Sequence, residues 1–195
     1  MLLTEFDANR QAIINPEALH EPLEGFPKIA VSCFSRLTFQ RMLEMFPHEL
    51  IYETSMANVA IPIYKLVIAE QELALFNAPV GASACVAILE DIFALGADKL
   101  VLFGTCGVLD EDIKETSIII PSHALRDEGT SFHYVEASDE IAVNVGVLDR
   151  FRSYLNERQI SHKEGKVWTT DGIYRETNGK LKARKAAGAI CVDME

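Results

Sequence analysis

The feature that most constrains the fold is a regular alternation of short β-rich segments with longer segments of helical periodicity. The predicted strands are residues 28–34, two within 59–79, then 99–103, 117–122, 163–170 and 189–193. The predicted helices are residues 37–46, 81–97, 139–159 and 178–188. Such alternation is typical of an α/β protein, and we find no linker or repeat that would divide residues 1–195, so we expect a single domain.

Two local patterns sharpen this expectation. A turn is expected near Glu70 and Gln71, between the two strands of residues 59–79. The run KLVLF at residues 99–103 is almost wholly apolar, which is typical of a strand buried on both faces of a sheet. With 49% hydrophobic residues in 195, the chain is large enough to bury a core.

The overall charge argues against nucleic-acid binding. The formal net charge is −11 and the isoelectric point is near 4.9, whereas proteins that bind phosphate backbones present cationic patches. The one basic cluster comprises Lys180, Lys182, Arg184 and Lys185. We favour the solvated face of a helix for this cluster, with a local anion site as the alternative.

Four cysteines, Cys33, Cys85, Cys106 and Cys191, are far apart and lack the spacing of a zinc site. We therefore expect free thiols, no metal and a reducing, cytoplasmic setting. The first residues lack the features of a signal peptide, and no apolar run approaches the roughly 20 residues of a membrane span. We expect no membrane partner.

Two segments of unusual composition follow predicted strands. In residues 102–110 (LFGTCGVLD), two glycines bracket Thr105 and Cys106, so backbone amides and a hydroxyl can approach an anion, although an ordinary turn explains the glycines equally well. Residues 126–134 (RDEGTSFHY) are rich in hydrogen-bond donors and aromatic rings, which predicts a loop that meets a ligand or a partner subunit. His133 is either an acid–base group or, as we favour, a structural residue.

Two further segments carry candidate ligand-binding groups. Residues 169–177 (TTDGIYRET) place Tyr174 where it can stack on a flat ring, with an Asp-Gly turn as the simpler explanation. Residues 188–195 (GAICVDME) put carboxylates at the end of a predicted strand, where open α/β sheets bind ligands. A carboxylate there suits a vicinal diol such as that of ribose, and a solvated terminus is the alternative.

These four segments, in this order, resemble the successive signatures of the nucleoside phosphorylase family, which comprises purine and uridine phosphorylases and related nucleosidases. The resemblance extends from Lys28 to Glu195, and RDEGTSFHY and YRET are more similar to the uridine phosphorylase-like branch. It implies a three-layer α/β/α fold around a mixed, partly barrel-like central sheet. It also implies a homo-oligomer, either a hexamer or a dimer, that needs no cofactor and uses phosphate as a co-substrate.

The activity implied is phosphorolysis of a ribonucleoside, such as uridine, to a free base and ribose 1-phosphate. By position, Glu195 is expected to bind the ribose hydroxyls and Met194 to pack on the sugar. Ile173 and Tyr174 fall where the family places residues beside the base. The resemblance assigns a catalytic role to two residues, and Glu195 is the first of them.

The second is Thr105, which is expected to contact phosphate, helped by the turn at Gly104 and Gly107. Arg36 falls where the family's first phosphate loop carries its arginine, but residues 32–36 (SCFSR) lack the family's Gly-Asp-Pro pattern. A second family arginine is replaced by Leu102. Either another cation substitutes, such as Arg126 or Arg175, or the nucleophile is water.

The departures keep open a nucleoside hydrolase on the same fold, and the expected absence of the family's C-terminal tail keeps open a non-catalytic nucleoside-binding protein. His20 is a weaker candidate for the contact that the family makes with the ribose 5′-hydroxyl. Family members continue for several dozen residues beyond the Met-Glu pair, so the resemblance also predicts that this chain is a C-terminally truncated form.

Overall fold

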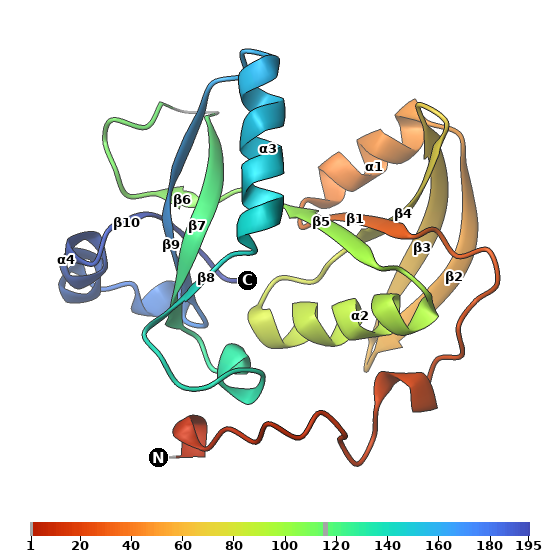
Figure 1. Cartoon of the computed structure of the whole chain (residues 1–195), viewed down its shortest axis with the longest axis horizontal. Helices are drawn as coiled ribbons and strands as arrows, with labels where there is room; N and C mark the ends of the chain where they lie inside the picture. The colour runs from red at the N-terminus through yellow and green to blue at the C-terminus, as the bar shows by residue number, and fades with distance from the viewer. Residues whose placement is uncertain (1, 115–116) are drawn as a thin grey trace. The chain divides into compact units, whose positions relative to one another are not determined.

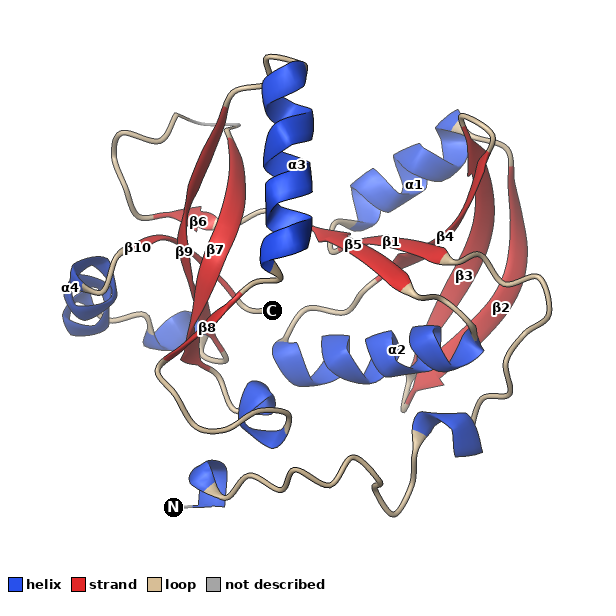
Figure 2. Ribbon diagram, viewed as in Figure 1, coloured by secondary structure: helices blue, strands red, loops and turns tan. Residues whose placement is uncertain are grey.

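The computed structural model describes residues 2–114 and 117–195. The chain divides into two compact units, residues 9–105 and residues 1–8 with 106–195, and each unit is described by itself. We call them the N-terminal unit and the C-terminal unit (Figures 1 and 2). Whether the two act as the single domain expected from the sequence stays a prediction.

The N-terminal unit is a five-stranded mixed sheet with a helix on each face. Its elements are η2 (Pro16–Ala18), β1 (Ile29–Cys33), α1 (Arg36–Met45), β2 (His48–Met56), β3 (Val59–Ile68), β4 (Gln71–Asn77), α2 (Ala82–Leu95) and β5 (Lys99–Phe103). The strand order is β2-β3-β4-β1-β5. The first two pairs are antiparallel, while β1 is parallel to both β4 and β5.

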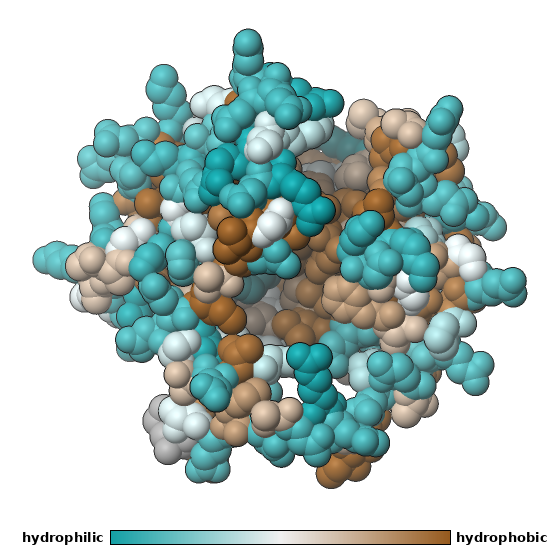
Figure 3. Space-filling model, in the orientation of Figure 1, coloured by the Kyte–Doolittle hydropathy of each residue, from teal (hydrophilic) through white to brown (hydrophobic). Residues whose placement is uncertain are grey.

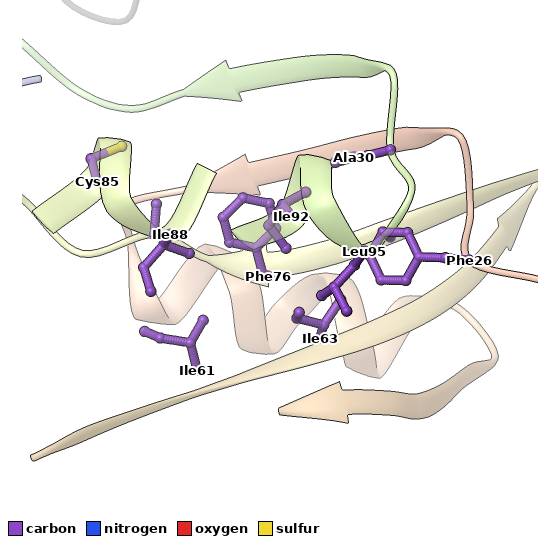
Figure 4. Close-up of a cluster of buried hydrophobic side chains, with 12 residues drawn as sticks. Phe26, Ala30, Ile61, Ile63, Phe76, Cys85, Ile88, Ile92 and Leu95 are labelled. Atoms are coloured by element: carbon purple, nitrogen blue, oxygen red, sulfur yellow. The ribbon is translucent and has the colours of Figure 1, made fainter. Parts of the chain in front are cut away.

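Two apolar clusters, one on each face of this sheet, hold its helices. Under α2, the buried side chains include Ile63, Phe76, Ile88, Ile92 and Leu95 (Figure 4). On the other face, Phe39 of α1 packs with Cys33, Leu66 and Leu75. Neighbouring residues such as Leu75 and Phe76 belong to different clusters because strand side chains alternate between faces.

The C-terminal unit repeats this plan with a second mixed sheet. Its elements are η1 (Leu2–Thr4), β6 (Gly107–Val108), β7 (Ile118–Asp127), η3 (Thr130–His133), β8 (Glu140–Ala142), α3 (Val145–Glu157), β9 (His162–Thr170), η4 (Ile173–Arg175), α4 (Asn178–Ala186) and β10 (Ala189–Asp193). The order is β6-β10-β9-β7-β8, with parallel strands β10, β9 and β7 in the middle. Helices α3 and α4 lie on opposite sides of this sheet (Figure 1).

The expected α/β class, with mixed sheets and helices on both faces, is confirmed. The barrel-like character is not, because among the described residues both sheets are open, with β2 and β5 at the edges of one and β6 and β8 at the edges of the other. The turn between β3 and β4 falls at Ala69 and Glu70, close to the predicted place, and both residues have positive φ.

Three element predictions need correction. The helix expected over residues 139–159 begins only at Val145, because Asn144 caps it and residues 140–142 pair with β7 as β8. The strand expected at 117–122 continues to Asp127, so the segment RDEGTSFHY starts within a strand. The strand of residues 99–103 is not buried on both faces, since β5 is an edge strand and Val101 is 52% exposed.

The surface is mixed in polarity. Hydrophilic residues predominate on the face drawn in Figure 3, and apolar residues lie among them. Within residues 2–114 and 117–195, the helices are too short or too polar to cross a bilayer.

Candidate functional site

Three polar side chains form a row across the carboxyl ends of the parallel strands in the C-terminal unit. Arg126 on β7 is in register with Thr169 on β9, and Thr169 is in register with Asp193 on β10. Partners in adjacent parallel strands project from the same face of a sheet, so all three side chains share one face. This is the edge at which open α/β sheets bind ligands.

Asp193 stands at one end of this row, next to Thr169. It accepts a hydrogen bond from the Thr169 hydroxyl at 2.8 Å and another from the backbone N–H of Glu195. The backbone N–H of Met194 donates in turn to the Glu195 carboxylate at 3.3 Å. Three successive residues are therefore organised as a turn at the end of β10, and Thr169 anchors that turn to the neighbouring strand.

The environment of Asp193 raises its pKa to about 6. Burial is the main cause, and the nearby Glu195 carboxylate adds to it, while the hydrogen bonds from Thr169 and from the Glu195 backbone act in the opposite direction. Two carboxyl groups of different character thus stand beside each other. Asp193 accepts a proton just below neutral pH, and Glu195 terminates the turn as a hydrogen-bond acceptor.

Arg126 is fixed by its own loop. Its Nε donates to Ser131 Oγ at 2.7 Å, its Nη1 donates to Glu136 O and Ser138 Oγ, and its guanidinium lies 4.0 Å from the centre of the Phe132 ring. The side chain is buried, and only Nη2 lacks a hydrogen-bond partner. The loop that follows β7 therefore uses Arg126 as its internal anchor, which leaves at most one edge of the guanidinium for an anion.

The two residues expected beside the base lie on η4, the turn of 3₁₀ helix that follows β9. Ile173 is 54% exposed and Tyr174 is 94% exposed. Arg175, the other proposed substitute cation, is the last residue of η4 and is also exposed. The structure thus presents Ile173, Tyr174 and Arg175 to solvent directly after the strand that carries Thr169.

Gly107 has a structural reason to be glycine. A Cβ atom at this position would lie 2.9 Å from Cγ1 of Val192 on the paired strand β10. The glycine therefore allows β6 to pack tightly against β10. Its expected role in substrate binding stays a prediction.

Sequence reasoning missed a second polar cluster, centred on Asp127 at the end of β7. Its carboxylate Oδ2 accepts from Trp168 Nε1 and Lys180 Nζ, each at 3.0 Å, and Arg184 Nη2 lies 3.3 Å away. Burial opposes ionisation, but the Lys180, Trp168 and Arg184 donors outweigh it and lower the pKa of Asp127. The four-residue spacing of Lys180 and Arg184 on α4 was the available signal, since it places both on one helix face.

This cluster corrects the favoured interpretation of the basic segment at residues 180–185. Two of its four cations, Lys180 and Arg184, hold α4 against β7 and β9 through Asp127 instead of forming a purely solvated face. The alternative, a local anion site, stays a prediction.

In the N-terminal unit, the candidate phosphate-binding residues follow two adjacent parallel strands. Cys33 at the end of β1 is in register with Phe103 at the end of β5, so the loops with Arg36 and with Thr105 begin side by side. A Cβ atom on Gly104 would lie 2.8 Å from the Phe34 ring, which shows how closely the loops approach. Arg36 and Thr105 are both exposed.

Ser35 gives the first of these loops its shape. Its hydroxyl accepts from the backbone N–H of Thr38 at 3.2 Å and caps α1, so Arg36 is the first residue of the helix. Leu102, which stands where the family pattern has an arginine, packs instead against the apolar cluster under α2. Of the cations that sequence reasoning named, Arg36 is the one that lies at this edge of the N-terminal sheet.

His20 belongs to a network within the N-terminal unit. Its Nε2 lies 3.1 Å from Asp91 Oδ1 and its Nδ1 lies 3.2 Å from the Tyr52 hydroxyl, while Thr54 donates to Asp91 Oδ2 at 2.7 Å. The network connects the segment before β1 with β2 and α2. Both ring nitrogens of His20 are therefore engaged within its own unit.

Comparison with known proteins shows which family the chain belongs to. Residues 28–195 match the Phosphorylase superfamily, and the chain belongs to that family. A DeoD-type purine nucleoside phosphorylase of Brevibacillus brevis is 29% identical over 101 residues, which are 51% of this chain and 43% of the relative. One from Bacillus cereus is 28% identical over 114 residues, which are 58% of this chain and 48% of the relative.

Solved structures show the same fold. The crystal structure of uridine phosphorylase from Vibrio fischeri has a TM-score of 0.78 at 18% identity, and the match covers 92% of this chain and 75% of that one. Purine nucleoside phosphorylase from Toxoplasma gondii, solved with immucillin-H, has a TM-score of 0.75 at 17% identity, covering 90% and 73%. The matched region spans less than half the length of the two curated relatives.

Proposed function

We propose that the chain binds a ribonucleoside and phosphate and cleaves the N-glycosidic bond by phosphorolysis. The observation that carries this proposal is the Thr169–Asp193–Glu195 turn at the carboxyl end of β10. It presents a carboxylate in a fixed position at the edge of the sheet, and a carboxylate can accept hydrogen bonds from both hydroxyls of a ribose diol. Met194 supplies an apolar surface for the sugar.

The remaining roles are assigned to the other exposed residues. Ile173 and Tyr174 flank the base, and Tyr174 offers its ring for stacking. Arg36 and Thr105, at the ends of β1 and β5, hold phosphate, with Gly104 and Gly107 shaping the loop. Phosphorolysis has an oxocarbenium-like transition state, so an enzyme gains by holding the sugar and placing an anion near C1′.

We further propose that uridine is the preferred substrate, on the resemblance of residues 126–134 and 174–177 to the uridine phosphorylase-like branch. The resemblance to the family supports a homo-oligomer, hexameric or dimeric, without a cofactor, and the free cysteines support a cytoplasmic location. Both purine and uridine phosphorylases are among the structural neighbours, so base preference is a question for assay.

Hydrolysis is the second candidate, and the packing of Leu102 favours it. An arginine at that position would offer phosphate a charge-assisted contact, whereas Leu102 is part of the apolar cluster. A non-catalytic protein that binds a nucleoside without turnover is the third candidate.

The deciding experiment measures base release from uridine, inosine and adenosine, each with and without phosphate. Release that requires phosphate supports phosphorolysis, and equal release without phosphate establishes hydrolysis. Nucleoside binding detected through Trp168 fluorescence, without turnover in either condition, identifies a binding protein. No binding and no turnover with any of the three nucleosides would contradict the proposal.

A further inference from the structure

Two of the four cysteines are neighbours in the C-terminal unit. Cys191 on β10 pairs with Val108 on β6, and Val192 pairs with Gly107. Cys106 directly precedes Gly107, so in an extended antiparallel pair its side chain falls on the same face as that of Cys191, in the diagonal position. The two thiols are in hydrogen-bond contact.

The environments of the two thiols differ in a useful way. Cys191 is 2% exposed, whereas Cys106 is half-buried. Burial, together with the adjacent Cys106 and the Asp193 carboxylate, raises the pKa of Cys191. Cys106 is therefore the thiol that a reagent in solution meets first. Cys191 reacts second, and because its raised pKa keeps the thiol protonated, this second step is expected to be the slower one and to accelerate as the pH rises.

The remaining two cysteines have a different setting. Cys33 and Cys85 lie in the N-terminal unit, on β1 and α2, and both are buried. The Cys33 thiol donates to the carbonyl of Ser35 at 3.5 Å. They belong to separate apolar clusters on opposite faces of that sheet, so they cannot pair with each other.

We propose that Cys106 and Cys191 form a reversible intramolecular disulfide, a redox modification site whose oxidant is a small disulfide of the oxidised glutathione type. The Cys106 thiolate attacks one sulfur of the oxidant, forms a mixed disulfide and releases one thiolate. The Cys191 thiolate then attacks the Cys106 sulfur, closes the internal bond and releases the second thiolate. The protein loses two protons and two electrons, and the oxidant becomes two thiols.

The geometry favours closure within the chain. A disulfide needs a sulfur–sulfur distance of about 2.05 Å and Cβ atoms about 3.5–4.5 Å apart. Diagonal neighbours on an antiparallel pair lie farther apart than this, so closing the bond requires side-chain rotation together with a shift of the backbone at Cys106, just before the two-residue strand β6. Bonds of this labile kind are the ones that serve regulation in reducing compartments.

The disulfide would have a consequence for the site. Cys106 directly follows Thr105, and Cys191 is two residues before Asp193. A covalent bond between them restrains the segment after the proposed phosphate loop against the strand that presents the proposed ribose carboxylate. This consequence rests on the proposed function, whereas formation of the disulfide does not.

The test is treatment of the chain with oxidised glutathione, followed by alkylation of the remaining thiols and mass spectrometry. We expect a species with two fewer alkyl groups than the reduced chain alkylated in the same way, with Cys106 and Cys191 in one linked peptide, and a dithiol reductant should reverse it. The variant Cys191→Ala should stop at a glutathione adduct on Cys106, and Cys106→Ser should block modification of Cys191. The matched variants Cys33→Ala and Cys85→Ala should still form the bond.

The proposal is overturned if the unmodified sequence ends as a stable glutathione adduct on Cys106, or if the linked peptide joins other cysteines. Trp168 fluorescence of each variant before oxidation verifies that the C-terminal unit is folded. If the disulfide forms, the rate of base release before and after reduction tests its effect on the site. An unchanged rate would contradict the regulatory consequence and leave the modification site established.

Discussion

The hydroxyl of Thr169 donates a hydrogen bond of 2.8 Å to the carboxylate of Asp193 on the adjacent parallel strand. The bond joins β9 to the end of β10 at the point where the chain turns toward Met194 and Glu195. It gives a half-buried carboxylate a partner on another strand. Its removal is therefore expected to affect both stability and the position of Glu195.

Thr169→Val removes this donor while keeping the shape of the side chain. Leaving a buried acceptor without its partner costs about 1–3 kcal/mol, so the free energy of unfolding of the C-terminal unit should fall by that amount. Denaturant unfolding followed through Trp168, the chain's one tryptophan, provides the measurement. Thr169→Ser, which keeps the hydroxyl, is the control, and an equal loss in both variants would show that the hydroxyl contributes nothing.

The raised pKa of Asp193 predicts an unusual pH dependence. Its folded pKa of about 6 lies above the ordinary value of 3.8, so the folded state binds the proton more tightly. The associated stability is fully present below about pH 4 and is lost as the pH rises through 6. The loss is on the order of 3 kcal/mol.

Asp193→Asn removes this titration. Relative to the unmodified chain, the variant should gain stability between pH 4 and pH 7, whereas exposed Asp112→Asn should show no such trend. Chemical unfolding at several pH values measures the difference. A difference that stays constant across this range would contradict the assignment of the raised pKa to Asp193.

The Asp127 cluster predicts the opposite pH dependence of stability. Burial raises the pKa of Asp127, but Lys180, Trp168 and Arg184 lower it by more. Its contribution to stability is therefore present at pH values above the ordinary pKa of an aspartate and is lost as the pH falls through the folded pKa. Asp127→Asn should destabilise the C-terminal unit by about 1–3 kcal/mol at neutral pH, because it withdraws the charge that faces two cations. Thermal unfolding of this variant beside Asp110→Asn compares the two sites, and equal midpoints would refute the prediction.

Arg36 is predicted to set the affinity for phosphate. A charge-assisted contact is worth about 1.5–3 kcal/mol, so Arg36→Ala should raise the KM for phosphate about 10- to 150-fold. Arg41→Ala, on the same helix and also exposed, is the matched control. Initial rates at varied phosphate concentrations give the KM for phosphate in each variant. Equal KM values in the two variants would remove Arg36 from the proposed site.

Sequence reasoning predicted the class of fold and most elements because hydrophobic periodicity records which faces are buried. It failed where pairing between distant segments overrode local preference. Residues 140–142 continue a helical pattern, yet they pair with β7 as β8. The apolar run at 99–103 indicated a strand buried on both faces, but burial depends on a strand's place in the sheet, and β5 is at the edge.

The candidate site was likewise predicted where the signal was local and missed where it depended on pairing between distant segments. The segment GAICVDME indicated carboxylates at a strand end, and the structure places Asp193 there with Glu195 in the turn beyond it. The partners Thr169 and Arg126 came from other segments, and only the strand register brings them into one row. Likewise, the residues that neighbour Asp127 in the sequence do not indicate that α4 supplies the cations that contact it.

The turn between β3 and β4 is a place where a change of sequence would stabilise the N-terminal unit. Ala69 and Glu70 both have positive φ, at 50° and 64°, a conformation that costs an ordinary L-residue roughly 1–2 kcal/mol. The two strands hold this turn closed through paired residues from Tyr64↔Leu75 to Ile68↔Gln71. An Asn-Gly sequence suits such a hairpin better, so replacing Ala69 and Glu70 with it offers protein engineers a way to strengthen the N-terminal unit at a distance from the chemistry.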